Sequence, residues 1–431
     1  MKKLVLFLML VSALVACAPS APAQPSASAP GVPKGKLVLL LSESPEGMVG
    51  YQGIIDAFAQ AHPDIQVMIN NASDEDLFLE RLTADFAAQT PPDIFITDYP
   101  LFAQFAVKGA LQPLDDYIAK SQDIHPSNYY PAAMDAFKFK GKQYCIPENL
   151  SSLEVYYNKK LFTAANLPFP KAGWTWDEFL RDARALTKGN QQYGAGIDPE
   201  SIRLMPFLWA HGAEFVDNSD LPTKLTLDSP TALEAFQWFV NLQVKEHVVP
   251  SRADEATEDS QSRFEHGTMG MYFMSRVATP DLRATIRDFD WDVAPMPADK
   301  STVTILHSDG YCIPSAGKNK DAAWAFVEFA NNMAGQQIIA KTGRTVPSLR
   351  SVAQSPLFLN AEVPPASSQI YLDMASNMRA VPTMTTWGEI EDTVNKEIER
   401  AFYGDISVNE AARTAVSETQ EYFKQNQTDM K

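Results

Sequence analysis

The sequence predicts an α/β protein, and three observations carry this prediction. Short apolar segments alternate with amphipathic helical patterns between residues 36 and 96. A second passage from strand to helix follows between residues 144 and 186. The chain has 431 residues, of which 45% are hydrophobic and 21% charged, which allows two domains or more with sizeable cores.

Three strands are expected in the first hundred residues. Residues 36–41 form an almost uninterrupted apolar run, as in a strand buried on both faces. Residues 65–69 and 92–96 are the second and third strands. A helix that ends near Pro63 separates the first two, and Ser73 is expected to cap a second helix through Ala88. Strand and helix in alternation predict parallel pairing with right-handed crossovers.

Polar residues follow the first and third of these strands. Glu43 lies just after the first strand, and Asp98 and Tyr99 follow the third. Ligands of open parallel sheets bind beyond the carboxyl ends of the strands. The sequence therefore predicts that these three residues contribute to a binding site.

The passage at residues 144–186 begins a second layer. Residues 155–157 are β-branched and aromatic, which favours a strand, and Asn158 ends it. Thr175 and Glu178 have the spacing of a capping box that starts a helix through Leu186.

The rest of the chain is richer in helical patterns. A helix is expected from Ser229 and Pro230 through residue 243, and another at residues 321–333. Residues 271–273 and 291–294 are expected as strands of a second sheet. The final helices, 387–403 and 408–423, start with the capping boxes Thr386/Glu389 and Ser407/Glu410.

The N-terminus has the features of an export signal. Two lysines precede an apolar run through residue 16, too short to span a bilayer. The small residues before Cys17 resemble a bacterial lipobox, which implies cleavage before Cys17 and lipidation of its thiol. The alternative is an ordinary signal peptide. Residues 17–36, rich in Ala, Pro and Ser, are expected to form a disordered tether. The protein is thus expected outside the cytoplasm, held at the membrane only by the lipid.

Charge excludes some partners. The formal net charge is −17, and removal of residues 1–16 with their two lysines leaves −19. An acidic surface repels phosphate backbones, so nucleic acid is not an expected partner.

Common catalytic and metal-binding motifs are missing from the sequence. It contains no nucleophile elbow, P-loop or His-Glu-x-x-His, and its six histidines are scattered. Residues 217–220 lack the later ligands of a calcium loop and predict a polar turn. No catalytic residue, metal or cofactor is expected. A distant carboxylate pair drawn from Glu43, Asp98 and Glu148 leaves a surface glycoside hydrolase as an alternative.

Several motifs in collinear order carry a family resemblance. They lie at residues 157–162, 175–179, 264–271, 293–297, 319–324 and 343–347. Over residues 37–425 the chain resembles the family 1 extracellular solute-binding proteins, the receptors of ATP-driven importers, of which the maltodextrin receptor is a familiar member. The resemblance implies two α/β lobes of the periplasmic-binding-protein type (type II), each a sheet flanked by helices, with the ligand cleft between them.

The repeated tetrapeptide Tyr-Cys-Ile-Pro, at residues 144–147 and 311–314, then falls where the chain crosses between lobes. The expected division is a signal peptide (1–16), the tether (17–36), lobe 1 (37–146 plus 312–357) and lobe 2 (147–311 plus 358–431). The expected function is a monomeric sugar receptor that closes on its ligand and is recognised by the permease subunits. The runner-up is the same fold with a phosphorylated polyol, an amine or a peptide as its solute.

The resemblance also implies site residues. Trp387 aligns with a ligand-stacking tryptophan of the maltodextrin receptor, and Asn149, Asp309 and Tyr311 lie beside the crossings. Arg276 falls where that receptor carries an aromatic residue, so it is expected to contact a hydroxyl cluster, a carboxylate or a neighbouring aspartate. Trp209 is either a ligand contact or a core residue, and Trp176 is expected to be a core residue.

Two cysteines remain after Cys17. Cys145 and Cys312 occupy the two copies of the repeated tetrapeptide. A disulfide across neighbouring hinge strands and two buried free thiols are both open.

Overall fold

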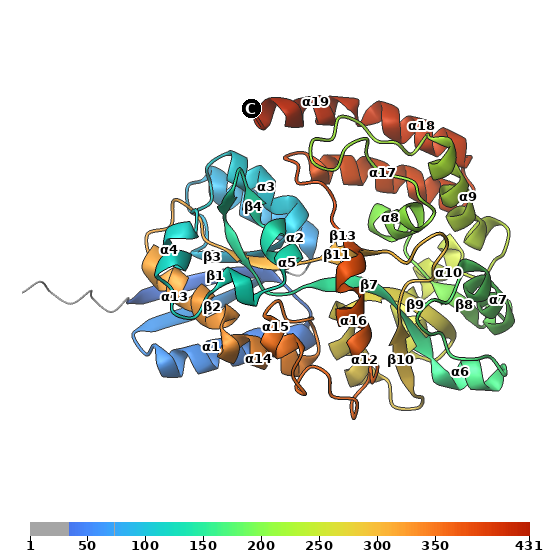
Figure 1. The fold of residues 1–431 in the computed structure, drawn as a ribbon, viewed down its shortest axis with the longest axis horizontal. Coiled ribbons are helices and arrows are strands. Elements are labelled where there is room, and N and C mark those ends of the chain that lie inside the picture. Colours follow the sequence, from blue (N-terminus) through green and yellow to red (C-terminus); the bar gives the residue numbers. More distant parts are fainter. Residues whose placement is uncertain (1–33, 73) are drawn as a thin grey trace, which may run out of the picture.

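The computed structural model describes residues 34–72 and 74–431. The predicted signal peptide, Cys17, most of the tether and Ser73 lie outside these residues. The described chain forms two halves, each built around its own sheet, and it passes between them along the extended segments near β7 and β11 (Figure 1).

The first half contains the predicted parallel strands. Its sheet has the order β2-β1-β3-β12-β6, in which β1 runs parallel to both β2 and β3 and β12 runs antiparallel to β3 and β6. The strands are β1 (Gly35–Ser42), β2 (Ile65–Ala72), β3 (Ile94–Asp98), β6 (Cys145–Pro147) and β12 (Asp309–Cys312). The parallel pairing expected for the first three strands is confirmed. The strand β1 starts two residues earlier than the lobe boundary expected at residue 37.

Helices cover both faces of this sheet. A core of β1, β3, α1, α13 and α14 side chains fills one face. The elements of this half are α1 (Pro45–Ala61), α2 (Glu75–Ala87), α3 (Tyr99–Val107), α4 (Asp115–Lys120), α5 (Pro131–Ala136), the hairpin β4 (Lys138–Phe139) and β5 (Lys142–Gln143), α13 (Lys320–Asn331), α14 (Met333–Thr342) and α15 (Arg350–Ala353), with a 3₁₀ turn at Pro126–Asn128. The cap of α2 is Asp74, whose side chain accepts from Leu77 N–H, so the cap expected at Ser73 is wrong.

The second half is built on the fully buried strand β7 (Ser151–Asn158). Its sheet has the order β13-β11-β7-β9-β8, and β10 also pairs with β7. The other strands are β8 (Tyr193–Gly196), β9 (Met269–Ser275), β10 (Trp291–Ala294), β11 (Thr304–His307) and β13 (Met378–Arg379). The helices are α6 (Lys159–Ala164), α7 (Trp176–Leu186), α8 (Ser201–Ala210), α9 (Pro230–Val244), α10 (Arg252–Thr257), α11 (Ser260–Glu265), α12 (Thr279–Thr285), α16 (Gln369–Asp373), α17 (Trp387–Phe402), α18 (Val408–Glu418) and α19 (Gln420–Asp429), with 3₁₀ turns at Arg276–Ala278 and Met374–Asn377.

Most of the predicted helix starts are confirmed. Thr175 and Glu178 form the reciprocal capping box of α7, and the side chains of Ser229 and Ser407 cap α9 and α18. The box expected at Thr386 is wrong, because the Thr386 hydroxyl donates to the carbonyl of Tyr422 at 3.0 Å and makes no cap bond to α17. The last expected helix is two helices, α18 and α19.

A disulfide joins Cys145 and Cys312, which settles the alternative left open by the sequence. The two cysteines are paired residues of the neighbouring strands β6 and β12. The bond therefore lies inside the first sheet. Cys145 comes just before the chain crosses to the second half, and Cys312 comes just after the chain has returned from it. None of the helices in the described part of the chain is long and apolar enough to cross a membrane.

Candidate functional site

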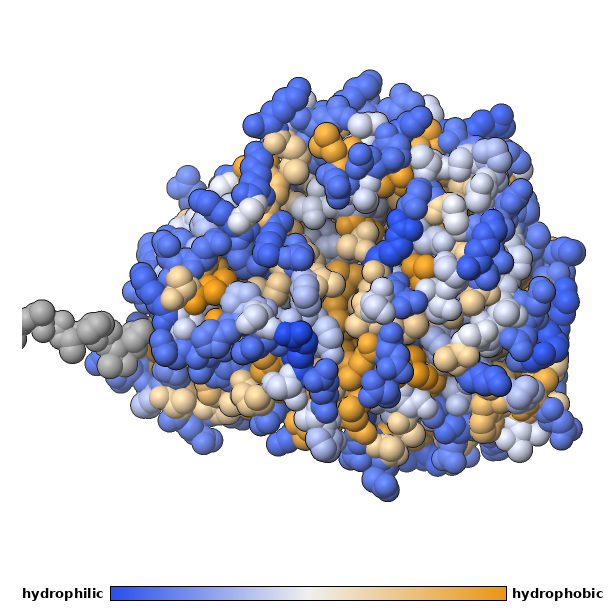
Figure 2. Space-filling model, in the orientation of Figure 1, coloured by the Kyte–Doolittle hydropathy of each residue, from blue (hydrophilic) through white to orange (hydrophobic). Residues whose placement is uncertain are grey.

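A cavity of about 620 Å³ lies between the two halves. The first half lines it with the carboxyl ends of β1 and β3 and the first turns of α2 and α3. The second half lines it with the first turns of α8 and α17 and with residues of β9 and β11. On the face shown in Figure 2, apolar residues gather in the furrow between the halves and hydrophilic residues cover its rims. This volume is typical of small-molecule sites.

Five of the predicted site residues line this cavity. Asp98 and Tyr99 lie where β3 passes into α3, Asn149 and Asp309 lie at the two chain crossings, and Trp387 is the first residue of α17. They come from segments almost 290 residues apart, and the fold brings them to one place. Their roles toward a ligand stay predictions.

Four predicted residues lie outside the lining. Glu43 binds Arg344, and Tyr311 is fully buried in the core of the first half. Trp209 is buried within the core of the second half, and Arg379 lies over its ring at 4.6 Å. Arg276 is 1% exposed and lies between the rings of Phe358 and Tyr371, at 4.4 and 4.9 Å. The structure therefore does not bring these four to the cavity.

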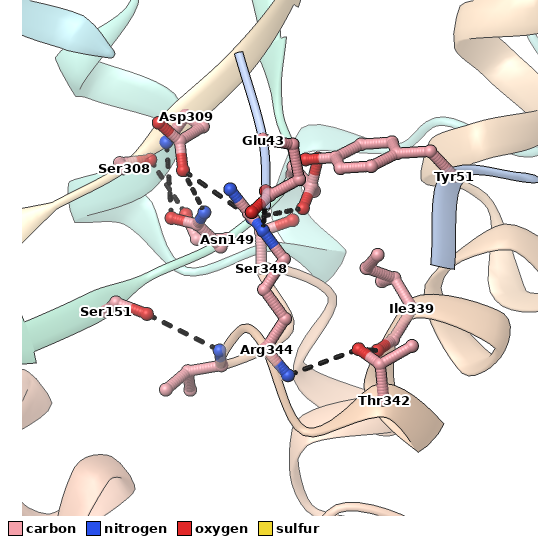
Figure 3. A network of polar contacts seen from close by, with 12 residues as sticks. Glu43, Tyr51, Asn149, Ser151, Ser308, Asp309, Ile339, Thr342, Arg344 and Ser348 are labelled. Atoms are coloured by element: carbon pink, nitrogen blue, oxygen red, sulfur yellow. Dashed lines mark hydrogen bonds and ion pairs between the residues drawn. The ribbon is translucent and has the colours of Figure 1, made fainter. Parts of the chain in front are cut away.

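A buried ionic network forms the wall of the cavity in the first half (Figure 3). Arg344, which lines the cavity, forms ion pairs with Glu43 and, at 3.2 Å, with Glu148. The Tyr51 hydroxyl donates to the second carboxylate oxygen of Glu148 at 2.9 Å. Burial raises the pKa of Glu148 to about 7, although Arg344 acts in the opposite direction. The network fixes Arg344 and ties α1 to the segment after α14.

The two chain crossings are bound to one another. The Asn149 side-chain amide donates to the Asp309 carboxylate at 2.7 Å and its oxygen accepts from Asp309 N–H at 3.2 Å. The Ser308 hydroxyl donates to Asn149 C=O at 2.7 Å. These bonds hold both crossing segments in one register (Figure 3).

Many buried polar atoms around the cavity have no partner among the described residues. Of fourteen such side-chain atoms, seven belong to lining residues. Four of these residues are at least nine-tenths buried, namely Thr97, Arg203, Thr345 and Trp387. The other two are Asp98 and His307. Buried polar groups are normally hydrogen-bonded, so this concentration distinguishes the cavity lining from the rest of the described core.

Carboxyl groups of the lining interact with one another. Burial, with the charges of Glu75, Asp309 and Glu391, raises the pKa of Asp98 well above its usual range. Burial also raises the pKa of Glu391 to about 7, while the bond that Ser201 donates lowers it. Burial lowers the pKa of His307 to about 3, so this imidazole is neutral at neutral pH. Among the described residues, no group of three His, Cys, Asp or Glu side chains is arranged to hold a metal ion.

Sequence reasoning missed Arg203, Arg344 and Glu391 as lining residues. Arg344 lies in the motif at residues 343–347, and this motif could have indicated a residue of the site. Arg203 and Glu391 lie within helices whose patterns indicate only an amphipathic stripe, and no local signal distinguishes them.

Comparisons with known proteins agree with this architecture. The profile of the bacterial extracellular solute-binding protein family matches residues 42–337. A putative binding protein of Brucella abortus is 25% identical, covering 79% of this chain and 82% of its own. The maltotriose-binding protein of Pyrococcus abyssi is 25% identical, covering 86% of this chain and 79% of its own.

A solved structure extends the similarity to the fold. An ABC substrate-binding protein of Listeria monocytogenes in complex with cycloalternan is 26% identical, with a TM-score of 0.84 over 90% of this chain and 98% of its own. The expected two-lobed α/β fold is thereby confirmed, and these relatives are binding proteins. The chain belongs to the bacterial extracellular solute-binding proteins.

Proposed function

We propose that this protein is the receptor of an ATP-driven importer and binds a saccharide in the cavity between its halves. The main support for this proposal is the number of buried polar atoms without hydrogen-bond partners in the cavity lining, which includes Trp387. A sugar offers hydroxyls to planar polar groups and C–H faces to aromatic rings, and this lining supplies both. The maltotriose- and cycloalternan-binding relatives support the same ligand class.

Binding closes the halves on the solute. The proposed lobes follow the two sheets, residues 35–147 plus 309–357 and residues 148–308 plus 358–431, with the pivot at the bonded segments around Asn149 and Asp309. Contacts made to the sugar by both halves favour the closed form, which the permease subunits then recognise. The protein acts as a monomer without catalysis, anchored outside the cytoplasm through lipidated Cys17.

A thermal-shift screen of the full chain tests this function. Neutral mono- and oligosaccharides, amines, phosphorylated polyols and peptides are each titrated. A ligand of the closed form raises the melting temperature, and the rise grows with the logarithm of its concentration relative to Kd. We expect a saccharide to give the shift and to be recovered intact. A shift only with non-saccharides would overturn the ligand class, and recovery of a hydrolysed sugar would overturn the receptor.

A further inference from the structure

The lining of the cavity is strongly acidic. Seven carboxylates line it: Glu75, Asp76, Asp98, Glu200, Asp309, Glu391 and Asp392. They come from both halves and from five different elements or their caps. The lining contains two arginines and a histidine that is neutral at neutral pH.

Both arginines already have carboxylate partners outside the lining. Arg344 pairs with Glu43 and Glu148, and Arg203 lies 3.6 Å from Asp198. Arg344 also lies 3.9 Å from the lining carboxylate of Asp309, and the charge of Arg203 acts on Glu200. The two arginines therefore compensate only part of the charge of the seven lining carboxylates.

Helix dipoles offset only part of this charge. The first turns of α2, α3, α8 and α17 lie at the cavity, and each helix N-terminus carries roughly half a positive charge. Four such ends supply about two charges, fewer than the seven carboxylates carry when all are ionised. Burial and repulsion among the carboxylates raise the pKa of Glu75, Asp98 and Glu391, so these carboxyls hold protons more readily until a cation binds. An anionic solute, such as a phosphorylated polyol, would meet repulsion here.

Asp98 is the carboxylate best placed to receive a cation. Its Oδ1 atom is buried without a hydrogen-bond partner, while the backbone N–H of Leu101 in α3 acts on the carboxyl group. The charges that act on it are those of Glu75, Asp309 and Glu391, so negative groups surround it. The helix α17 packs against α3 and brings Trp387, whose indole N–H is also unpartnered, into the same lining.

We propose that the solute carries a protonated amine or another cationic group, which Asp98 receives together with Glu75 and Glu391. This inference rests on the proposed saccharide receptor and narrows its ligand to a basic saccharide. The positive group forms charge-assisted hydrogen bonds with Asp98 and relieves the repulsion among the carboxylates.

Calorimetric titration of the full chain with matched sugars tests this proposal. Glucosamine and its β-1,4-linked disaccharide carry amines where glucose and cellobiose carry hydroxyls, so each pair differs in charge but not in skeleton. Spermidine and choline are added as cations without a sugar. We expect the amine to bind at least 10-fold tighter than its hydroxyl counterpart, and the difference to shrink when NaCl rises from 0.05 to 0.5 M.

Two variants locate the cation. Asp98→Asn keeps the shape of the side chain and should abolish the preference, with Glu391→Gln as a second variant should the first not fold. Glu80→Gln removes the same charge from an exposed position of α2 outside the cavity and should retain the preference.

The outcomes separate the two proposals. A hydroxyl sugar that binds as tightly as its amine would overturn the cationic ligand and leave the saccharide receptor standing. If spermidine or choline binds and none of the sugars does, the saccharide ligand class is overturned and the cation site is retained. A chain that binds none of the cations would overturn the cation site.

Discussion

The hydroxyl of Tyr99 accepts a hydrogen bond from the backbone N–H of Val381 at 2.8 Å, and this bond joins the two halves beside the cavity. Tyr99 begins α3 of the first half, and Val381 lies between β13 and α17 of the second. Both residues are buried, so the bond is made away from water. The contact therefore depends on how closely the halves approach.

We expect Tyr99→Phe to weaken ligand binding. The substitution keeps the ring but leaves the Val381 N–H without its acceptor, which costs about 1–3 kcal/mol in the form where the halves touch. A cost of this size corresponds to a loss of about 5- to 150-fold in affinity. Calorimetry measures the Kd. Tyr117→Phe, which removes a hydroxyl bonded to Asp321 on the first half, is the control. Equal Kd values for both variants and the parent would contradict the role of this bond.

Trp387→Ala should weaken solute binding by about 1.5–3 kcal/mol through lost apolar burial. Trp387 is 1% exposed, so the same change also lowers stability by about 3–5 kcal/mol. Trp387→Phe is the milder test because it keeps an aromatic face.

The matched control for this prediction is Trp176→Phe. Trp176 is also buried in the core, stacks on Trp238 at 4.2 Å, has an unpartnered indole N–H and lies outside the cavity. Both variants should lower the melting temperature, and only the Trp387 variant should raise Kd. An unchanged Kd would remove Trp387 from the site.

Arg344→Met should destabilise the fold by about 3–5 kcal/mol. The change leaves Glu43 and Glu148 buried without their cation, and an unpaired buried charge is costly. Urea unfolding measures the loss. Adding Glu148→Gln to the variant should restore part of it, because one of the two charges is then gone. A loss below about 1 kcal/mol would show that the network contributes little.

Stability should fall as pH rises from about 4.5 to 7, and Glu391 should account for part of this fall. The folded pKa of Glu391, about 7, lies above its usual 4.5 because of burial. The folded state thus holds this proton more tightly, so the stabilisation is full below pH 4.5 and is lost through pH 7. The expected loss is on the order of 3 kcal/mol.

Unfolding free energies at pH 5 and pH 7.5 check this expectation. Glu391→Gln cannot ionise, so the difference between the two pH values should be smaller for the variant than for the parent. The carboxyl of Glu148, whose pKa is also about 7, keeps a residual slope in both proteins. Identical slopes for variant and parent would contradict the assignment.

Local patterns predicted much of the fold. The first three strands follow from apolar runs whose meaning does not depend on distant residues, and β1, β2 and β3 lie where these runs are. The predicted capping box at Thr175 is confirmed for the same reason, because Thr175 and its partner Glu178 lie within one helical turn. The cap at Thr386 failed because the carbonyl of Tyr422, 36 residues later, takes its hydroxyl.

The site was predictable only where it follows strand ends and chain crossings. Asp98, Tyr99, Asn149 and Asp309 lie at such positions and line the cavity. Arg276 does not, because Phe358 and Tyr371, more than 80 residues later in the chain, cover its guanidinium. Contacts between distant parts of the chain determine where such side chains lie. The spacing of residues in the sequence does not predict these contacts.

The place of β12 determines when the first half can be completed during synthesis. This strand lies between β3 and β6, yet its residues, Asp309–Cys312, follow most of the second half in the chain. A chain made from its N-terminus therefore leaves Cys145–Pro147 without a neighbouring strand until more than 300 residues have been made. The two halves cannot mature one after the other, and formation of the Cys145–Cys312 bond reports that the last strand of the first sheet has arrived.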